Sequence, residues 1–186
     1  MNRNIPYIKE GANVYSIPTK LFENRIIMLN DEIEDELAGD IVSQLLYLDA
    51  TNNKDISLYI NSTGGVVTSG LAICDAIEKI KSDVRTICFG QACSMASLIL
   101  SSGTRGKRSS LPNSRIMIHQ PMGGCYGQST DIKIQCTEIE RIENIIYSMF
   151  SRYTGKNEKQ IKKDCNRDNF MSPEEAIEYG LIDEVI

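Results

Sequence analysis

The sequence contains no tryptophan, only one histidine and no surplus of basic residues. Its 25 acidic residues outnumber its 20 lysines and arginines, and a net charge of −5 leaves nothing to neutralise nucleic-acid phosphates. The longest basic cluster, RGKR at 105–108, is typical of a solvated turn. No apolar run approaches the roughly 18 residues that a membrane span requires. The composition therefore argues against a nucleic-acid partner and against a membrane protein.

Motifs for metal binding, nucleotide binding and export are also missing. The six cysteines form no CxxC pair and there is one histidine, so we expect free thiols and no metal. No GxxxxGK[ST] loop is present, so this chain is not expected to use ATP itself. The N-terminus MNRNIPYIKEG lacks the apolar region of a signal peptide. We expect a cytoplasmic protein, or an organellar one if a transit peptide has been removed.

Strand-like and helical segments alternate along the 186 residues, a length that suits one domain. β-branched segments bounded by turn formers predict strands at 25–29, 55–60, 84–90, 115–119 and 181–186. Apolar residues at helical spacing predict helices at about 33–48, 68–81, 94–100, 131–153 and 172–180. The last helix carries a capping box, with Ser172 as cap, Glu175 as its partner and Gly180 as the stop. The alternation predicts an α/β fold with largely parallel, buried strands.

Three polar motifs, NSTGG, GQACS and MIHQP, each follow a predicted strand, where catalytic groups of α/β folds tend to lie. Ser94, in GQACSMASLIL, is either the cap of a buried helix or a nucleophile. A nucleophilic serine needs a base, and His119 is the only histidine available, although a lone histidine is more often structural. The base also needs an orienting carboxylate. Spacing alone leaves this carboxylate open among Asp131, Asp164, Asp168 and Asp183.

Backbone groups near Ser94 are candidates to stabilise an oxyanion, although the GxSxG motif of α/β-hydrolases is absent. The N–H of Met95, at the start of the predicted helix, is one candidate donor because the first N–H groups of a helix are unpaired. Gly64-Gly65 supplies a second, since glycine lets the backbone approach a ligand closely. The other interpretation of this glycine pair is a tight turn.

The chain also resembles the proteolytic subunit family of the Clp proteases (ClpP). The resemblance runs in family order from about Leu21 to the C-terminus, through LYINSTGG, ICFGQACSMAS, GKRSSLPNSRIMIHQPMGG, GQSTDI and RDNFMSPEEAIEYGLIDEVI. It implies a serine endopeptidase with Ser94 as nucleophile, His119 as base and Asp168 as orienting carboxylate. The oxyanion donors it implies are the N–H groups of Gly65 and Met95. The implied substrate-binding residues are Val66, Val67, Met122, Gly123 and Gly124.

The resemblance also implies an architecture and a set of partners. The expected fold is the ClpP/crotonase-like fold of stacked ββα units, as a single domain over 1–186. Within it, 1–20 would form the axial pore and contact the ATPase, and about 123–155 would form a protruding handle. Family members assemble as two stacked heptameric rings that receive unfolded polypeptides from a hexameric AAA+ ATPase. The resemblance therefore implies that the partner uses ATP, that this chain needs no cofactor, and that it works in protein quality control.

The chain departs from the family motifs at several positions. Thr63 replaces the usual proline, Ser97 is larger than the residue common there, and Asn166 replaces an acidic residue that helps tie ring to ring. The N-terminal segment is also short. These departures suggest a subunit that forms its double ring less readily alone and works in mixed rings with a paralogous subunit. Two alternatives stay open, a scaffold subunit without activity and an acyl-CoA enzyme of the crotonase type.

Overall fold

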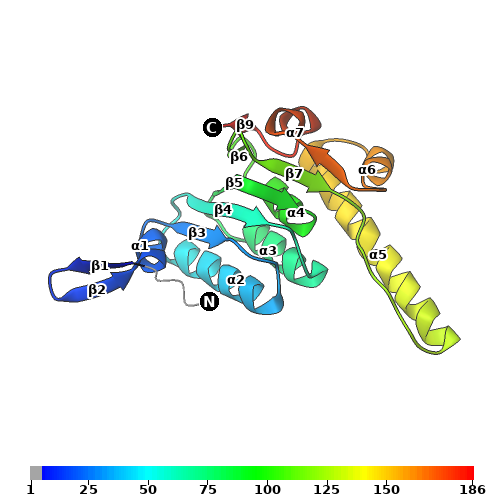
Figure 1. Cartoon of the computed structure of the whole chain (residues 1–186), viewed down its shortest axis with the longest axis horizontal. Helices are drawn as coiled ribbons and strands as arrows, with labels where there is room; N and C mark the ends of the chain where they lie inside the picture. The colour runs from blue at the N-terminus through cyan, green and yellow to red at the C-terminus, as the bar shows by residue number, and fades with distance from the viewer. Residues whose placement is uncertain (1–5) are drawn as a thin grey trace.

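A mostly parallel sheet forms the centre of the structure, a computed structural model that describes residues 6–186 (Figure 1). Its strands are β3 (Ile26–Leu29), β4 (Ile56–Ser62), β5 (Val84–Cys93), β6 (Arg108–Ser110), β7 (Arg115–Ile118), β8 (Asn169–Met171) and β9 (Glu184–Val185). The order is β3-β4-β5-β6-β9, with β7 paired to the far end of β5 and β8 paired to β7. Only the β7–β8 pairing is antiparallel. The predicted α/β class with largely parallel strands is confirmed.

Helices cover the sheet, and a separate hairpin extends from it (Figure 1). The helices of the described residues are α1 (Ile17–Glu23), α2 (Asp35–Thr51), α3 (Val67–Lys79), α4 (Met95–Ser101), α5 (Ser129–Thr154), α6 (Glu158–Asp164) and α7 (Pro173–Tyr179). The hairpin consists of β1 (Tyr7–Glu10) and β2 (Asn13–Ser16). Helix α4 packs between α3, α5 and the strand β5. No helix within 6–186 has both the length and the apolar character to cross a membrane.

The long strand β5 changes partners along its length. Its first half pairs with β6, from Thr86 to Cys88, and its last residues pair with β7, from Gln91 to Cys93. The β4–β5 register also shifts between Ile60 and Ser62. At the C-terminal end of β5 the strand therefore lies between β4 and β7. The loops that follow these three strands leave the sheet at the same edge.

The core lies between the sheet and helices α2 to α5. Strand β4 alternates between fully buried and half-buried residues, as expected for a strand covered mainly on one face. Helix α2 buries the stripe Ala38, Ile41, Leu45 and Leu48, which follows the predicted helical spacing. Each fully buried leucine or isoleucine stabilises the fold by about 1.5–3 kcal/mol. Ile33, predicted inside this helix, instead precedes it and bridges to Gly65.

The predicted capping box at the start of α7 is confirmed. The Glu175 N–H donates to Ser172 Oγ at 3.2 Å, and the Ser172 N–H donates to Glu175 Oε2 at 2.8 Å. Pro173 occupies the first turn, and Gly180 ends the helix in the left-handed conformation with φ of 96°. Local sequence alone therefore places both ends of this helix.

The structure contains several short elements that the sequence analysis did not predict, most of them toward the two ends of the chain. The hairpin, α1, β6, α6 and β8 were not predicted, because these short elements have weak periodicity. The final strand, predicted over 181–186, is limited to Glu184–Val185, since Leu181 and Ile182 are buried in the core after α7 instead. Within the predicted pore segment 1–20, residues 1–5 lie outside the described part of the chain.

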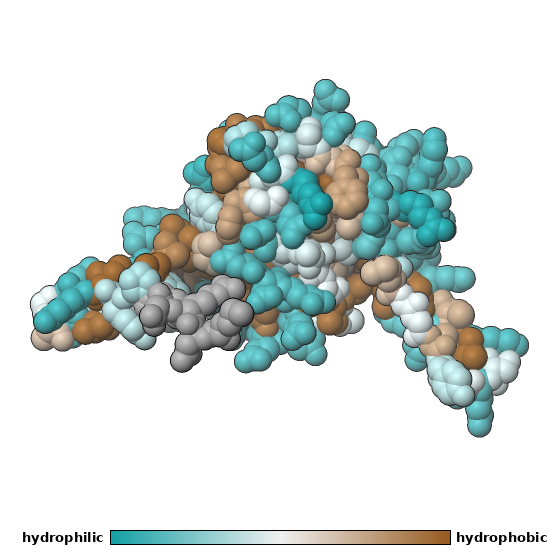
Figure 2. All heavy atoms as spheres, in the orientation of Figure 1, coloured by the Kyte–Doolittle hydropathy of each residue, from teal (hydrophilic) through white to brown (hydrophobic). Residues whose placement is uncertain are grey.

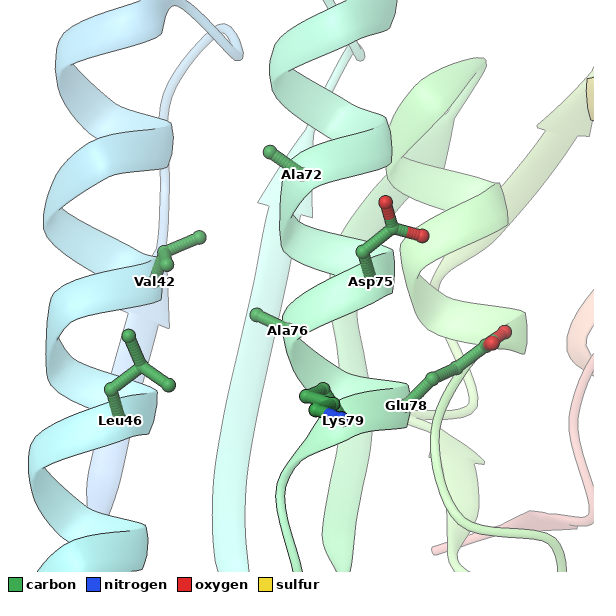
Figure 3. A pocket seen from close by; sticks show the side chains of 7 residues that line it. All are labelled: Val42, Leu46, Ala72, Asp75, Ala76, Glu78 and Lys79. Carbon is green, nitrogen blue, oxygen red and sulfur yellow. The ribbon is translucent and has the colours of Figure 1, made fainter.

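Helix α5 projects far from the sheet, and its buried residues begin only at Ile146 (Figure 1). Apolar side chains lie exposed on this projection, among them Ile134, and on the hairpin, among them Val14 (Figure 2). An open apolar groove also runs between α2 and α3, lined by Val42, Leu46, Ala72 and Ala76 and edged by Asp75, Glu78 and Lys79 (Figure 3). Each of these three surfaces exposes apolar side chains to solvent.

Candidate active site

Ser94 lies in the sharp turn between β5 and α4. Its φ of 55° and ψ of −126° are sparsely populated for a residue with a side chain, at a cost of order 1–3 kcal/mol. Although Ser94 takes the N-cap position of α4, its side chain makes no capping hydrogen bond. The strained strand–turn–helix geometry is that of a nucleophile elbow, reached without the GxSxG motif. The helix-cap interpretation of Ser94 is therefore not supported.

The β5–β7 register brings His119 to this turn. Cys93 pairs with Met117, so the chain segments after them leave the sheet side by side. The Ser94 N–H donates to the Met117 carbonyl at 2.9 Å and ties the turn to β7. Nε2 of His119 lies 2.9 Å from Oγ of Ser94, at hydrogen-bond distance.

The antiparallel β7–β8 pair brings Asp168 to the other side of the imidazole. Ile118 pairs with Asn169, so the adjacent residues His119 and Asp168 face each other just beyond the ladder. Nδ1 of His119 lies 2.9 Å from Oδ1 of Asp168, although the two residues are 49 positions apart. The Asp168 side chain is 59% exposed and the His119 side chain 12% exposed. Water therefore reaches the carboxylate, while the imidazole is largely enclosed.

The other candidate carboxylates lie elsewhere. Asp183 binds the guanidinium of Arg108, and Asp164 accepts a hydrogen bond from Tyr179. Asp131 lies in the first turn of the projecting helix α5. Of the four aspartates left open by spacing, the structure brings only Asp168 to His119.

The Gly64-Gly65 loop packs directly against the Ser94 turn. A Cβ on Gly64 would lie 2.7 Å from Cβ of Ser94, and one on Gly65 would overlap the backbone of Ile33. Hydrogen bonds hold this contact on both sides: Ile33 N–H to the Gly64 carbonyl at 2.8 Å, and Val66 N–H to the Ile33 carbonyl at 2.7 Å. The glycine pair is thus more than a tight turn, because only residues without side chains fit here.

Two backbone N–H groups near Ser94 are available to an external acceptor. Met95 is the first residue of α4, so its N–H has no acceptor within the helix. The hydrogen bonds found among residues 6–186 include none donated by the N–H of Gly65. The missing Cβ of Gly64 would lie 3.1 Å from the Met95 nitrogen, so the glycine loop passes over the start of α4. This arrangement can stabilise a negative charge that develops beside Ser94.

A narrow apolar pocket lies beside Ser94 and His119, with room for about one water molecule. Its apolar walls are Val67, Met95, Leu98, Pro121, Ile146 and Phe150. Sequence reasoning assigned Val67 to substrate binding but missed Ile146 and Phe150. Their spacing on α5 indicates only an apolar helix face, and nothing in it separates a pocket wall from ordinary core.

The remaining residues implied for substrate binding lie in the segments that follow β4 and β7. Val66 is half exposed at the N-cap of α3, next to the Ile33–Gly65 bridge. Met122, Gly123 and Gly124 are exposed in the extended segment that leads into α5. β4 and β7 pair with opposite edges of β5, so these residues and the glycine loop follow strands on either side of the Ser94 turn.

Cys93, the neighbour of Ser94, does not compete with it as a nucleophile. Its side chain is buried, and burial raises the pKa of the thiol above its ordinary value. A thiol kept protonated is a poor nucleophile. Among residues 6–186, no group of three or more His, Cys, Asp or Glu side chains is arranged to hold a metal ion.

Comparison with protein families gives a match over nearly the whole chain. A family model described as Clp protease matches residues 9–186. The matched region contains the Ser94 turn, the glycine loop, His119 and Asp168.

Proposed function

This chain belongs to the Clp protease family, and on that basis we propose that it is a serine-type peptidase that cleaves unfolded polypeptides. The proposal rests on two hydrogen-bond contacts of the His119 imidazole, both at 2.9 Å: Nε2 to Ser94 Oγ and Nδ1 to Asp168 Oδ1. A hydroxyl at hydrogen-bond distance from an oriented imidazole is an activated nucleophile.

The proposed reaction follows from these positions. With its proton on Nδ1 donated to Asp168, His119 has a free Nε2 that accepts the Ser94 proton as Oγ attacks the peptide carbonyl carbon. The negative charge on the carbonyl oxygen is stabilised by the N–H groups of Gly65 and Met95. His119 then gives its proton to the leaving amine, and an acyl-enzyme forms. Water, activated by the same imidazole, releases the acid and restores Ser94.

The surroundings favour an extended peptide with an apolar side chain at the cleaved bond. The narrow pocket beside Ser94 has apolar walls, so a substrate side chain for which it widens would be apolar rather than charged. We propose, from the family resemblance, that Val66 and Val67 on one side and Met122, Gly123 and Gly124 on the other bind the peptide backbone; exposure of Val66 and of residues 122–124 supports this. Main-chain contacts of this kind bind many sequences with little selectivity.

We propose that the chain acts within two stacked heptameric rings and receives substrate from a hexameric AAA+ ATPase, which uses the ATP. Family membership supports an oligomer that works with Clp ATPases. The exposed apolar residues on α5 and the groove between α2 and α3 are surfaces that assembly would cover. Enclosure would also keep a weakly selective site away from folded proteins. Asn166 replaces the acidic residue that helps tie ring to ring in the family. We therefore also propose that the chain forms mixed rings with a paralogous subunit.

Labelling with a fluorophosphonate tests the proposal, because this reagent modifies only an activated serine hydroxyl. We expect one label per chain, on Ser94, and no label in Ser94→Ala. His119→Ala is the matched control, since it keeps the hydroxyl but removes the base and should also prevent labelling. An apolar fluorogenic peptide should be hydrolysed only by protein that takes the label. Peptide hydrolysis that persists unchanged in Ser94→Ala would refute the proposal.

Labelling that requires an added paralogous subunit would identify a mixed ring. No labelling under either condition, with rings still formed on sedimentation, would instead identify a scaffold subunit.

A further inference from the structure

The carbonyl of Ser94 is held unusually firmly for a group at the start of a helix. It accepts a hydrogen bond from the Ser97 hydroxyl at 2.6 Å, from the Ser97 N–H at 3.0 Å and from the Leu98 N–H at 3.3 Å. The hydroxyl contact is the shortest of the three. Ser97 is fully buried, so water does not compete for this bond.

This carbonyl and the proposed oxyanion donor belong to the same peptide unit. The peptide bond between Ser94 and Met95 is planar, so the Ser94 C=O and the Met95 N–H point in opposite directions within one plane. Whatever anchors the oxygen therefore also sets the direction of the N–H. A hydrogen bond to the oxygen also polarises the amide and makes its N–H a better donor, since hydrogen bonds in chains strengthen one another.

The anchor matters at this position because the Ser94 backbone is strained. Its φ of 55° is uncommon for a residue with a side chain. A small rotation of the Ser94–Met95 peptide plane would relax the turn and swing the Met95 N–H away from the space next to Ser94 Oγ. The three hydrogen bonds to the carbonyl oppose that rotation.

We propose that Ser97 is a positioning residue, whose hydroxyl aims and polarises the Met95 N–H through their shared peptide unit. This inference rests on the proposed serine-peptidase function. Ser97 itself does not touch the substrate, and its effect passes entirely through the Ser94 carbonyl. Its hydroxyl thus makes a contact that an alanine or a glycine there could not make.

Ser101 provides a matched control on the same helix. Its hydroxyl donates to the Ser97 carbonyl, also at 2.6 Å, and the residue is equally buried. The N–H of that peptide unit belongs to Leu98 and donates to the Ser94 carbonyl rather than to a substrate. Ser97→Ala and Ser101→Ala therefore remove the same kind of bond, and only the first lies in the peptide unit of the Met95 donor.

The expected effect is a moderate loss of kcat. Removing a whole oxyanion donor costs about 10²–10³ in kcat, and the hydroxyl strengthens that donor by about 10–30%, so Ser97→Ala should lower kcat about two- to eightfold. KM should stay unchanged, because the donor acts mainly in the transition state. Affinity for a peptide boronate, which forms a tetrahedral adduct on Ser94, should fall by the same factor. Ser101→Ala should lower kcat and boronate affinity much less, because its bond reaches the Ser94 carbonyl only indirectly, through the 3.3 Å bond from the Leu98 N–H.

The assay uses the full chain, with the oligomeric state and melting temperature of both variants measured alongside. Equal kcat losses in Ser97→Ala and Ser101→Ala would overturn the inference, as would a raised KM with unchanged kcat. If Ser97→Ala does not fold, Ser97→Cys keeps the space filled with a thiol that donates only weakly, and it must show the same kcat loss. A wild-type chain that takes no fluorophosphonate, either alone or with a paralogous subunit, would refute the proposed function, whereas a labelled wild type with equal variants would refute only the role of Ser97.

Discussion

The buried ion pair between Arg108 and Asp183 is a contact whose loss should clearly weaken the fold. Arg108 is 3% exposed, and its guanidinium donates to Asp183 through Nε at 2.9 Å and Nη2 at 2.6 Å. Its Nη1 donates to the carbonyls of Ser101 and Tyr153, at the ends of α4 and α5. The pair therefore connects the C-terminal region to α4 and α5, two of the helices that line the pocket beside Ser94.

Asp183→Ala would leave a guanidinium buried without its counter-ion. Breaking a buried pair in this way costs about 3–5 kcal/mol. The Asp183 side chain is 21% exposed, so water can enter the vacated space and partly solvate Arg108. We therefore expect a loss at the lower end, about 3 kcal/mol, which for a typical urea m-value of about 2 kcal/mol/M lowers the midpoint by about 1.5 M.

Urea unfolding followed by circular dichroism measures this change, since the chain has no tryptophan for fluorescence. The control is Glu138→Ala, which breaks the exposed Arg141–Glu138 pair on α5 and should leave the midpoint almost unchanged. Protein concentration must be equal in all samples, because assembly also stabilises the folded chain. A midpoint shift for Asp183→Ala no larger than that for Glu138→Ala would refute the reasoning.

The difference in the free energy of unfolding between wild type and Asp183→Ala should also depend on pH, which gives an independent check. Burial raises the pKa of the Asp183 carboxyl, but the hydrogen bonds from Arg108, its charge and the Gly106 N–H outweigh burial, so the pKa lies below the ordinary 3.8. The stabilisation by the carboxylate is therefore complete above pH 3.8 and is lost as the pH falls below that value through the folded-state pKa. The free energy of unfolding of wild type should exceed that of Asp183→Ala by a constant amount from pH 7 to about pH 5. This difference should become smaller only in stronger acid.

Three further predictions concern the site and the thiols. Asp168→Asn should lower kcat roughly 10²- to 10⁴-fold with little change in KM, because a neutral amide cannot stabilise the imidazolium and its NH2 group can donate to Nδ1, which favours the wrong tautomer of His119. An unchanged kcat would remove Asp168 from the mechanism. Gly65→Ala should abolish peptidase activity and lower the melting temperature, because the added Cβ overlaps the Ile33 backbone; full activity would contradict the close packing of that loop. Burial raises the pKa of the Cys88 thiol to about 11 and that of the Cys74 and Cys165 thiols to about 12. These three thiols should therefore resist a disulfide reagent at pH 8 until the protein is denatured. Exposed Cys125 and Cys136 should react first in the unassembled chain, and rapid reaction of Cys74 in native protein would contradict the burial.

Local sequence signals account for much of the fold. Apolar spacing predicts α2, α3 and α5, and the capping box and stop glycine of α7 predict both of its ends. These signals act over a few residues, within one or two helical turns, so they can be found without knowing the tertiary structure. The pairing of Ser94 with His119 was also predictable, because the chain contains no other histidine.

Only the tertiary structure decides which other groups meet at Ser94. The residues alone left four aspartates open; the resemblance to a family indicated Asp168, and the antiparallel register of β7 and β8 places it against His119. The walls of the pocket and the strained backbone of Ser94 likewise depend on contacts between segments far apart in the chain. Sequence determines local preferences of helices, caps and turns, but strand register and packing set the distances between side chains on which chemistry depends.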